Sequence, residues 1–595
     1  MKQLNHAARI SLIAAIMAGA SATASAKPAV RTSEKVTQPD GTTLTIRLVG
    51  DEHAHLYLTE DGCPLVWDND LGFVYATISK EGKQIPTGVT AHDADRRTQS
   101  ESMTAIPMSD NTIASILDTR MARRQEMRRT ARNTGLPRKS QGYGLSDTTF
   151  PSTGEQKAIV ILVQFQDLKF GDKNSSSYQY SAYSDSEDPV HAYWTDLLNK
   201  EGFDGFGGEG SCRDWFHANS ADSEGNAQFS PIFDLYGPVT LPNNMAYYGQ
   251  NDYWGNDENA HLMVVDACEI LDNEVDFTQY DRDGDGLVDN IYIFYAGFGE
   301  ADSRQTNTVW PHSWDLHYVN ADFEVDGVTV DHYACSNETD YGRRSPDGIG
   351  TFVHEFSHVL GLPDLYTTVY NNSYTPGEYS VLDYGPYNNN GRTPPNYSAY
   401  ERWALGWMTP DKYETSGSVE LSNLADSNMA FVVPTEKETE YYLVENRQQT
   451  GWDKYIPGHG MLIWHIDYVK EIFDDNVVNN TPTHQYVDLI EANGKKNEKY
   501  ASGHTFPGTS NITSYSFKSW SGTPCGVELN DITESDGIII KRADVTTQGG
   551  VGNIATESDC PETYFNLQGI PVSNPSNGQI LIRRSGGKSE KIIAR

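Results

Sequence analysis

The sequence has few cysteines, few basic residues and no long hydrophobic run. Its six cysteines form no C-x-x-C pair, so no thiolate zinc site and no particular disulfide pairing is predicted. Lys and Arg number 45 against 82 Asp and Glu, and the net charge of −37 argues against nucleic acid as a partner. No apolar run is long enough for a transmembrane helix. With 34 Tyr and 11 Trp in 595 residues, the composition indicates a globular protein of several folded units.

Residues 1–26 resemble a secretory signal peptide. Lys2 and Arg9 supply positive charge, the run SLIAAIMAGASATA is apolar, and ASA at 24–26 is a small-residue cleavage site. A membrane anchor is the alternative, but the run is short and ends in small residues. We therefore expect a secreted protein, extracellular or at the cell surface, with no membrane span after signal removal.

Residues 27–140 are expected to form an N-terminal propeptide. Their first part is strand-rich, and 119–139 contain eight basic residues and a single acid. Residues 1–139 carry a net charge of +3, while the remainder carries −40. A basic, Gly- and Pro-flanked segment between a small unit and an acidic body is typical of a processing site. The alternative is a solvated basic helix.

The rest of the chain divides into segments with different hydrophobic patterns. Continuous apolar runs predict buried strands at 157–166 and 290–299, and helical periodicity predicts a helix over 349–360. A capping box predicts another helix from Ser398. Beyond Pro410, short alternating runs are typical of an all-β sandwich. The predicted units are a catalytic domain at 150–410, a β-sandwich at 411–548 and a tail at 549–595 that weakly resembles C-terminal sorting segments.

The stretch GTFVHEFSHVLGLPDLY carries the chemistry. His354 and His358 are four residues apart, so both project from one helical face and can share a metal ion. Glu355 lies where it can reach a water at the metal but not the metal itself. Gly361 permits a sharp turn that returns Asp364 as a third ligand, leaving the open position of a catalytic zinc site. The alternative is a buried helix whose histidines are satisfied by the core.

Downstream, the segment SVLDY at 380–384 resembles the S-x-M-x-Y turn of the metzincin zinc peptidases. Leu382 stands where that turn has methionine, and its similar volume can preserve an apolar floor under the metal. Tyr384 is a candidate donor to the reaction's oxyanion, with plain core packing as the equal alternative.

Together these motifs resemble the immune inhibitor A family of secreted bacterial metalloproteases. The similarity includes GPVTLPNNMAYYG, SAYERWALGW and YYLVENRQQTGWDKYIPGHGMLIWHIDY, and it extends from about residue 150 to about residue 540. The resemblance implies an α+β metzincin-like catalytic domain with a twisted mixed sheet and an active-site helix, one zinc ion, calcium sites and a propeptide. It implies zinc ligation by His354, His358 and Asp364, with Glu355 as general acid and base.

The segment DRDGDGLVD follows the EF-hand pattern through its ninth position. Gly286 permits the sharp turn, but position twelve is Tyr292 rather than a closing glutamate. Carboxylates so close together repel one another unless a cation is bound, and the alternative is an acidic surface turn. The predicted Ca²⁺ ligands are Asp281, Asp283, Asp285 and Asp289, with the backbone carbonyl of Leu287.

The N-terminal unit offers residues that can block a zinc ion in a latent form. These are Asp51, His53, His55 and Cys63, and a thiolate is a good zinc ligand. An ordinary buried cysteine is the favoured alternative for Cys63.

The sequence thus predicts a secreted zinc-dependent endopeptidase, made as a zymogen and stabilised by calcium. Its partners would be protein or peptide substrates and its own propeptide. One rival is a catalytically decayed extracellular binding protein on the same scaffold, for which Leu382 is the only support. Another is a zinc hydrolase of a non-peptide bond, which casein or gelatin digestion would distinguish.

Overall fold

The structure is a computed structural model in which the chain divides into two compact units, Met1–Asp544 and Val545–Arg595. The predicted signal peptide lies outside the described residues. No helix in the described part of the chain is long and apolar enough to cross a bilayer. The structure describes residues 33–132, 145, 150–173, 175–319, 321, 323–369, 373–546, 563–565, 580–585 and 588–593.

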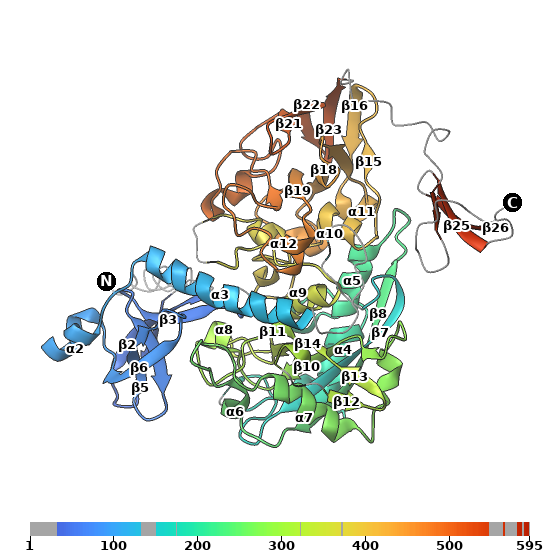
Figure 1. Cartoon of the computed structure of the whole chain (residues 1–595). Helices are drawn as coiled ribbons and strands as arrows, with labels where there is room; N and C mark the ends of the chain where they lie inside the picture. The colour runs from blue at the N-terminus through green and yellow to red at the C-terminus, as the bar shows by residue number, and fades with distance from the viewer. Residues whose placement is uncertain are drawn as a thin grey trace, which may run out of the picture. The chain divides into compact units, whose positions relative to one another are not determined.

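The N-terminal region is a six-stranded antiparallel sheet followed by two helices (Figure 1). Side chains alternate along the second strand, so Leu44, Ile46 and Leu48 are buried while their neighbours are half-exposed. The predicted strand-rich character is confirmed. The elements are β1 (Glu34–Thr37), β2 (Thr43–Gly50), β3 (His55–Thr59), β4 (Pro64–Asp68), β5 (Gly72–Ile78), β6 (Gln84–Thr90), α2 (Gln99–Thr104) and α3 (Asp110–Arg132).

The first part of the predicted basic linker is folded rather than open. It lies in α3, where Arg120 is 1% exposed. The Arg120 guanidinium donates to the backbone carbonyl of Gly82 at 2.9 Å and to that of His55. A buried, hydrogen-bonded arginine is not accessible to a protease, so the start of the expected cleavage segment needs correction. Residues 133–139 of that segment lie outside the described residues.

The central region is built on a five-stranded mixed sheet of order β11-β14-β10-β7-β8. Four neighbouring strands are parallel, and only β11 is antiparallel. The elements are β7 (Gly154–Gln164), α4 (Pro189–Asn199), α5 (Cys212–Ser220), β8 (Phe229–Thr240), α6 (Met245–Gly249), α7 (His261–Leu271), β9 (Leu287–Val288), β10 (Ile291–Tyr295), α8 (Glu300–Ser303), β11 (His312–Asp315), β12 (Phe323–Val325), β13 (Val328–Val330), β14 (His332–Asn337), α9 (Gly350–Val359) and α10 (Ala399–Ala404).

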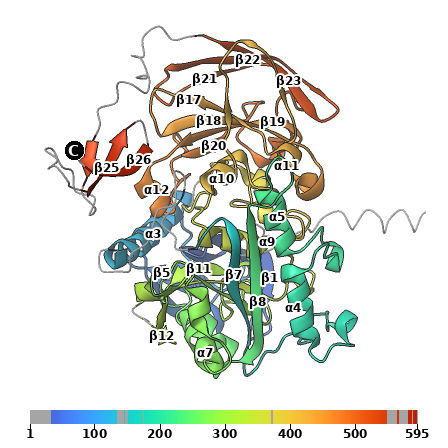
Figure 2. The same cartoon turned by 90° about the vertical axis from the view of Figure 1, so that its right-hand side faces the viewer.

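Both faces of this sheet are buried, which explains the continuous apolar run of β7. Val160 and Leu162 face the core shared with α4, α5 and α9, and Ile159 and Ile161 face the core shared with α7. Figure 2 shows α4 and α5 on one side of β7 and β8 and α7 on the other. The predicted mixed sheet and helices are confirmed; parallel strands covered on both faces refine the α+β expectation to a mixed α/β region.

The region after Pro410 consists mainly of two sheets, of order β15-β17-β18-β19-β20 and β16-β23-β22-β21. Tyr442 of the first sheet contacts Phe517 of the second, with ring centroids 5.0 Å apart. The elements are β15 (Asp411–Lys412), β16 (Gly417–Leu421), α11 (Leu424–Ser427), β17 (Phe431–Pro434), β18 (Glu440–Arg447), β19 (Gly460–Asp467), α12 (Lys470–Asp474), β20 (Val487–Leu489), β21 (Tyr515–Lys518), β22 (Pro524–Ser535) and β23 (Ile538–Val545).

The second unit contains an antiparallel three-stranded sheet of β24 (Thr563–Phe565), β25 (Ile580–Ser585) and β26 (Lys588–Ile593).

In the described part of the chain, Cys63, Cys212, Cys268, Cys335 and Cys525 are free thiols.

Candidate metal centre

The candidate centre begins on α9, whose apolar side holds it in the core. Phe352 and Phe356 of α9 pack against Phe233 of the central sheet with ring centroids 5.0 and 5.4 Å away. The helix ends at Val359, and Gly361, two residues later, has a φ of +92°, a conformation that favours glycine. The N–H of Gly361 donates to the carbonyl of His358 at 2.9 Å. The chain therefore reverses there, as predicted, and brings Asp364 back beneath the helix.

Three donor atoms converge at this point. Oδ1 of Asp364 lies 3.4 Å from Nε2 of His354 and 3.3 Å from Nε2 of His358. The two Nε2 atoms are 3.3 Å apart. A tetrahedral zinc ion with ligands at about 2.0–2.1 Å has neighbouring ligand atoms about 3.3–3.4 Å apart. The triangle therefore has the dimensions of three corners of a tetrahedral zinc site.

Two backbone carbonyls fix the orientations of the histidine rings. Nδ1 of His354 lies 2.8 Å from the carbonyl of Val381, and Nδ1 of His358 lies 2.7 Å from that of Leu362. Because a carbonyl can only accept, each Nδ1 carries a proton, and Nε2 of each ring faces Asp364. This arrangement is typical of metal-ligating histidines.

The charges of His354, His358 and Asp364 favour a positive charge between the three side chains. Burial alone lowers the pKa of His358, but the Asp364 carboxylate outweighs it and raises that pKa to about 9. Burial lowers the pKa of His354. Burial would raise the pKa of Asp364, yet His358 and His354 hold it well below its usual range. An ionised, fully buried Asp364 thus needs a proton on His358 or a cation between the three residues.

Glu355 lies on the same helix and is 3% exposed. Its charge adds to the effects that raise the pKa of His358, so it acts on the centre electrostatically.

The turn that contains Leu382 lies under the centre. The Val381 carbonyl accepts from His354, and the Leu382 carbonyl accepts from the N–H of Leu365 at 2.8 Å. Leu382 is fully buried in the same core as α9. Tyr384 is half-buried, is stacked on Tyr387, and lines a cavity of about 940 Å³ with Tyr366.

Asn476 supports Asp364, the candidate third ligand, and the sequence did not predict this role. Its Oδ1 accepts from the N–H of Asp364 at 2.8 Å, and its Nδ2 donates to Oδ2 of Asp364 at 2.6 Å. Because Asn476 bonds Oδ2 of Asp364, Oδ1 is the oxygen that faces the two histidines. Asn476 follows α12 in the predominantly β region, and no local pattern marks it.

Of the possible latency residues, the structure brings His53 to the centre. A ring nitrogen of His53 and carboxylate oxygens of Glu52 and Asp364 lie within 4.8 Å of one another. Glu52 was not singled out by the sequence. Burial and the Asp364 charge raise the pKa of Glu52 to about 7.

The other three candidates have other partners. Cys63 is buried in the core of the N-terminal sheet, where Sγ is 3.9 Å from the carboxylate oxygens of Asp61, so the guess that it blocks the centre is wrong. His55 stacks on Trp310 with centroids 4.5 Å apart. The Asp51 carboxylate accepts backbone N–H groups within its own turn.

The predicted calcium loop forms a compact acidic turn. Carboxylate oxygens of Asp281, Asp283 and Asp285 lie within 4.8 Å of one another. Gly286 has a φ of +90°, as the sharp turn requires, and Leu287 begins β9. Burial raises the pKa of Asp289 to about 8, and its three acidic neighbours push it in the same direction.

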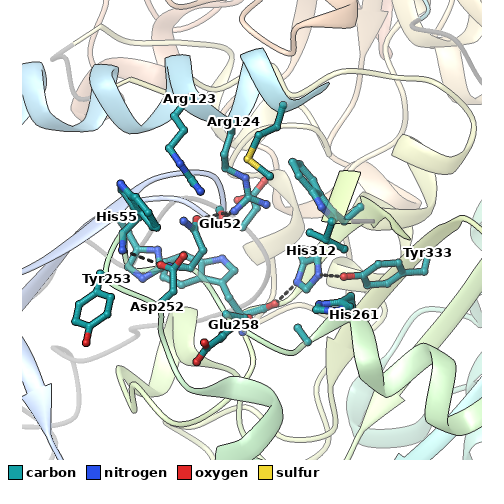
Figure 3. A pocket seen from close by; sticks show the side chains of 18 residues that line it. Glu52, His55, Arg123, Arg124, Asp252, Tyr253, Glu258, His261, His312 and Tyr333 are labelled. Atoms are coloured by element: carbon teal, nitrogen blue, oxygen red, sulfur yellow. Dashed lines mark hydrogen bonds between the residues drawn. The ribbon is translucent and has the colours of Figure 1, made fainter. Parts of the chain in front are cut away.

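A cavity of about 310 Å³ lies between α3 and the central region and is lined by residues of both (Figure 3). Arg123 and Arg124 point from α3 toward it, and Asp252 and Glu258 line it from below. The Arg124 guanidinium also lies 4.0 Å from the ring centroid of Trp314. The N-terminal region therefore contacts the central region through its basic helix.

The fold and site define a mixed α/β domain with a candidate single-metal centre of two histidines and an aspartate. Residues 148–408 match the family described as immune inhibitor A peptidase M6, catalytic domain. The pre-pro-metalloprotease PrtV of Vibrio cholerae serotype O1, matched in two strains, is 28% identical over 280 residues, or 42% of this chain and 29% of PrtV. Immune inhibitor A of Bacillus thuringiensis subsp. alesti is 25% identical over 271 residues, or 41% of this chain and 38% of that protein.

Residues 148–408 are thus the part of the chain that matches the immune inhibitor A peptidase M6 family. The resemblance predicted from HEFSHVLGLPDLY is confirmed over these residues, and the matched domain is of the metalloprotease type. The predicted similarity from there to about residue 540 lies beyond the matched range. The alignments span 29–38% of the length of the curated relatives.

Proposed function

We propose that the chain is a secreted zinc-dependent endopeptidase that hydrolyses peptide bonds of proteins. The observation that carries this proposal is the triangle of Nε2, Nε2 and Oδ1 atoms with sides of 3.3–3.4 Å. His354, His358 and Asp364 would hold the zinc ion. Three protein ligands with a fourth position for water or substrate are the pattern of a catalytic zinc site.

Bound zinc would supply Lewis-acid polarisation of the attacking water and of the scissile carbonyl. Glu355 would remove a proton from that water and return it to the leaving amine. Tyr384, which lines the neighbouring cavity, would donate a hydrogen bond to the oxyanion. The remaining residues orient these groups: the carbonyls of Val381 and Leu362 hold the histidine rings, and Asn476 holds Asp364.

The large cavity supports a peptide as the substrate. It has a volume of about 940 Å³ and lies beside Tyr366 and Tyr384. One side of it is lined by residues 47–51, most of which belong to β2. A cavity lined on one side by an extended segment of this chain would also accept an extended substrate segment.

The proposal also includes the domain boundaries and a calcium site. Residues 27–140 would form the propeptide of a zymogen, 150–410 a metzincin-like catalytic domain, 411–548 a β-sandwich, and 549–595 a tail. The acidic turn at 281–289 would bind structural Ca²⁺. All six strands of the N-terminal sheet precede residue 91, so a single cut beyond α3 would sever them from the rest of the chain.

The substitution Glu355→Gln tests the assignment. It removes the base but no zinc ligand, so proteolysis of casein by the processed protein should fall at least about a hundredfold while the zinc content stays unchanged. Retained activity would refute the role of Glu355, and loss of zinc would refute its place outside the ligand set. A wild-type protein that binds zinc but cuts neither casein nor gelatin would instead favour a non-peptide substrate or a decayed scaffold.

A further inference from the structure

The N-terminal region contacts the central region with basic side chains that lie against tryptophan rings. The Arg123 guanidinium lies 3.9 Å from the ring centroid of Trp254. That of Arg124 lies 4.0 Å from the ring centroid of Trp314, and the Lys83 ammonium lies 4.9 Å from Trp254. The face of an indole ring attracts a cation at these distances, and the planar guanidinium also stacks on it. The central region therefore offers two binding positions for arginine side chains.

Acidic and amide groups of the central region surround these tryptophans. Among the described residues that line the cavity of about 310 Å³, Lys and Arg come only from α3, whereas the central region supplies Asp252, Asp257 and Glu258. Oδ1 of Asn256 accepts from the Arg124 guanidinium at 2.5 Å. In Figure 3 both arginines of α3 point toward this acidic side. The charge of the surface thus complements a basic segment.

Contacts within the central region hold the surface in shape. Oδ1 of Asp252 accepts the N–H of Trp254 at 2.8 Å and that of Asn256 at 3.0 Å. Trp314 lies in β11 and packs on Tyr318 with ring centroids 5.1 Å apart. None of these contacts involves α3, so they remain when the N-terminal region is absent.

The surface adjoins the candidate metal centre. The Trp314 ring lies 6.3 Å from the ring of His53, centroid to centroid. A ring nitrogen of His53 in turn lies within 4.8 Å of a carboxylate oxygen of Asp364. One side chain of the N-terminal region thus spans the gap between Trp314 and the candidate ligand. A substrate that occupies the centre after this region has left can therefore reach Trp314 with a residue near the cleaved bond.

We propose that Trp314 and Trp254 form a substrate subsite for arginine side chains, which opens when the N-terminal region is released. The subsite rests on the proposed endopeptidase function and defines a substrate class for it, proteins that carry arginine close to the cleaved bond. In the uncut chain Arg123 and Arg124 occupy the two rings, so the chain's own side chains show what the surface accepts.

The experiment compares native casein with casein whose arginines have been converted to citrulline by a peptidylarginine deiminase. Citrulline has nearly the shape of arginine but no charge. The trypsin-processed protein, freed of trypsin and of the released N-terminal region, should cleave citrullinated casein with a kcat/KM about threefold to thirtyfold lower. Glu355→Gln protein treated in the same way measures any residual trypsin activity.

Two variants and a control assign the preference to the surface. Trp314→Leu should reduce the preference to less than about twofold. Trp254→Leu should also weaken it, which keeps the test decisive if Trp314→Leu folds poorly. Trp403→Leu, a change at a half-buried tryptophan that packs on Tyr441, should retain it.

Equal cleavage of the two caseins by the wild type would overturn the subsite. So would a preference that survives both Trp314→Leu and Trp254→Leu. A wild-type protein that cleaves neither casein would instead overturn the proposed function itself.

Discussion

At the scale of single residues, Asn476 holds Asp364, the proposed third ligand, in place. Its side chain bonds both the backbone N–H and Oδ2 of Asp364, at 2.8 and 2.6 Å. Removing these bonds frees the Asp364 carboxylate to rotate away from the histidines. Residues that orient a ligand are generally worth about tenfold to a hundredfold in metal affinity.

We therefore expect Asn476→Ala to weaken zinc binding by about tenfold to a hundredfold, measured by competition with a chromophoric chelator. Asn511→Ala is the matched control: Asn476 has a φ of 56° and Asn511 one of 50°, so both changes carry the same backbone penalty. Equal zinc affinity in the two variants would mean that Asp364 is oriented without Asn476.

The residues of the centre also show what a sequence can predict. His354, His358 and Asp364 lie within one helix and its following turn, so their spacing alone predicts that they meet. Asn476 and Glu52 are separated from Asp364 by 112 and 312 positions. Their contacts depend on how three regions pack together, for which a single sequence gives no signal.

At the scale of elements, the acidic turn 281–289 leads into β9 and β10. β9 pairs with β13, and β10 lies at the centre of the main sheet. A cation in this turn would therefore stabilise the segment that leads into the sheet against which α9 packs.

Calcium at about a hundredfold over its Kd should stabilise the protein by about 2.7 kcal/mol, equivalent to a rise in melting temperature of about 5–10 °C. Asp283→Asn with Asp285→Asn should abolish the rise. The control pair Glu201→Gln with Asp204→Asn, at exposed acids of the same region, should retain it. An unchanged calcium response in the first pair would assign the ion to another site.

The elements differ in how well their sequences predict them. The runs of β7 and β10 are continuous and apolar because both sheet faces are buried, and the Ser398 capping box opens α10 as expected. The sequence of α3 does not show that its arginines are packed against other parts of the chain. Its arginines look like a solvated surface in the sequence, but Arg123 and Arg124 stack on Trp254 and Trp314, which are distant in the chain.

At the scale of the whole molecule, the N-terminal region, with its charge of +3 up to residue 139, contacts an acidic body. The predicted cleavage segment from Arg120 to Lys139 overlaps α3, which continues to Arg132. The buried Arg120 and the stacked Arg123 and Arg124 should resist trypsin.

Limited trypsin digestion of the uncut chain should therefore produce a new N-terminus after residue 128 or beyond, together with the appearance of casein-degrading activity. N-terminal sequencing identifies the cut, and the digestion rate at Arg120 is the internal comparison. Full activity before any cut would mean that residues 27–140 are a permanent domain. A first cut at Arg120 would contradict the packing of α3.

The metal content of the purified chain tests the central claim most directly, with wild type, Asp364→Asn and Asp283→Asn dialysed together and measured by inductively coupled plasma mass spectrometry. The account predicts about one tightly held zinc ion in the wild type and in Asp283→Asn, and its loss in Asp364→Asn. A wild-type chain without zinc, or an Asp364→Asn chain that keeps as much zinc as the wild type, would contradict it.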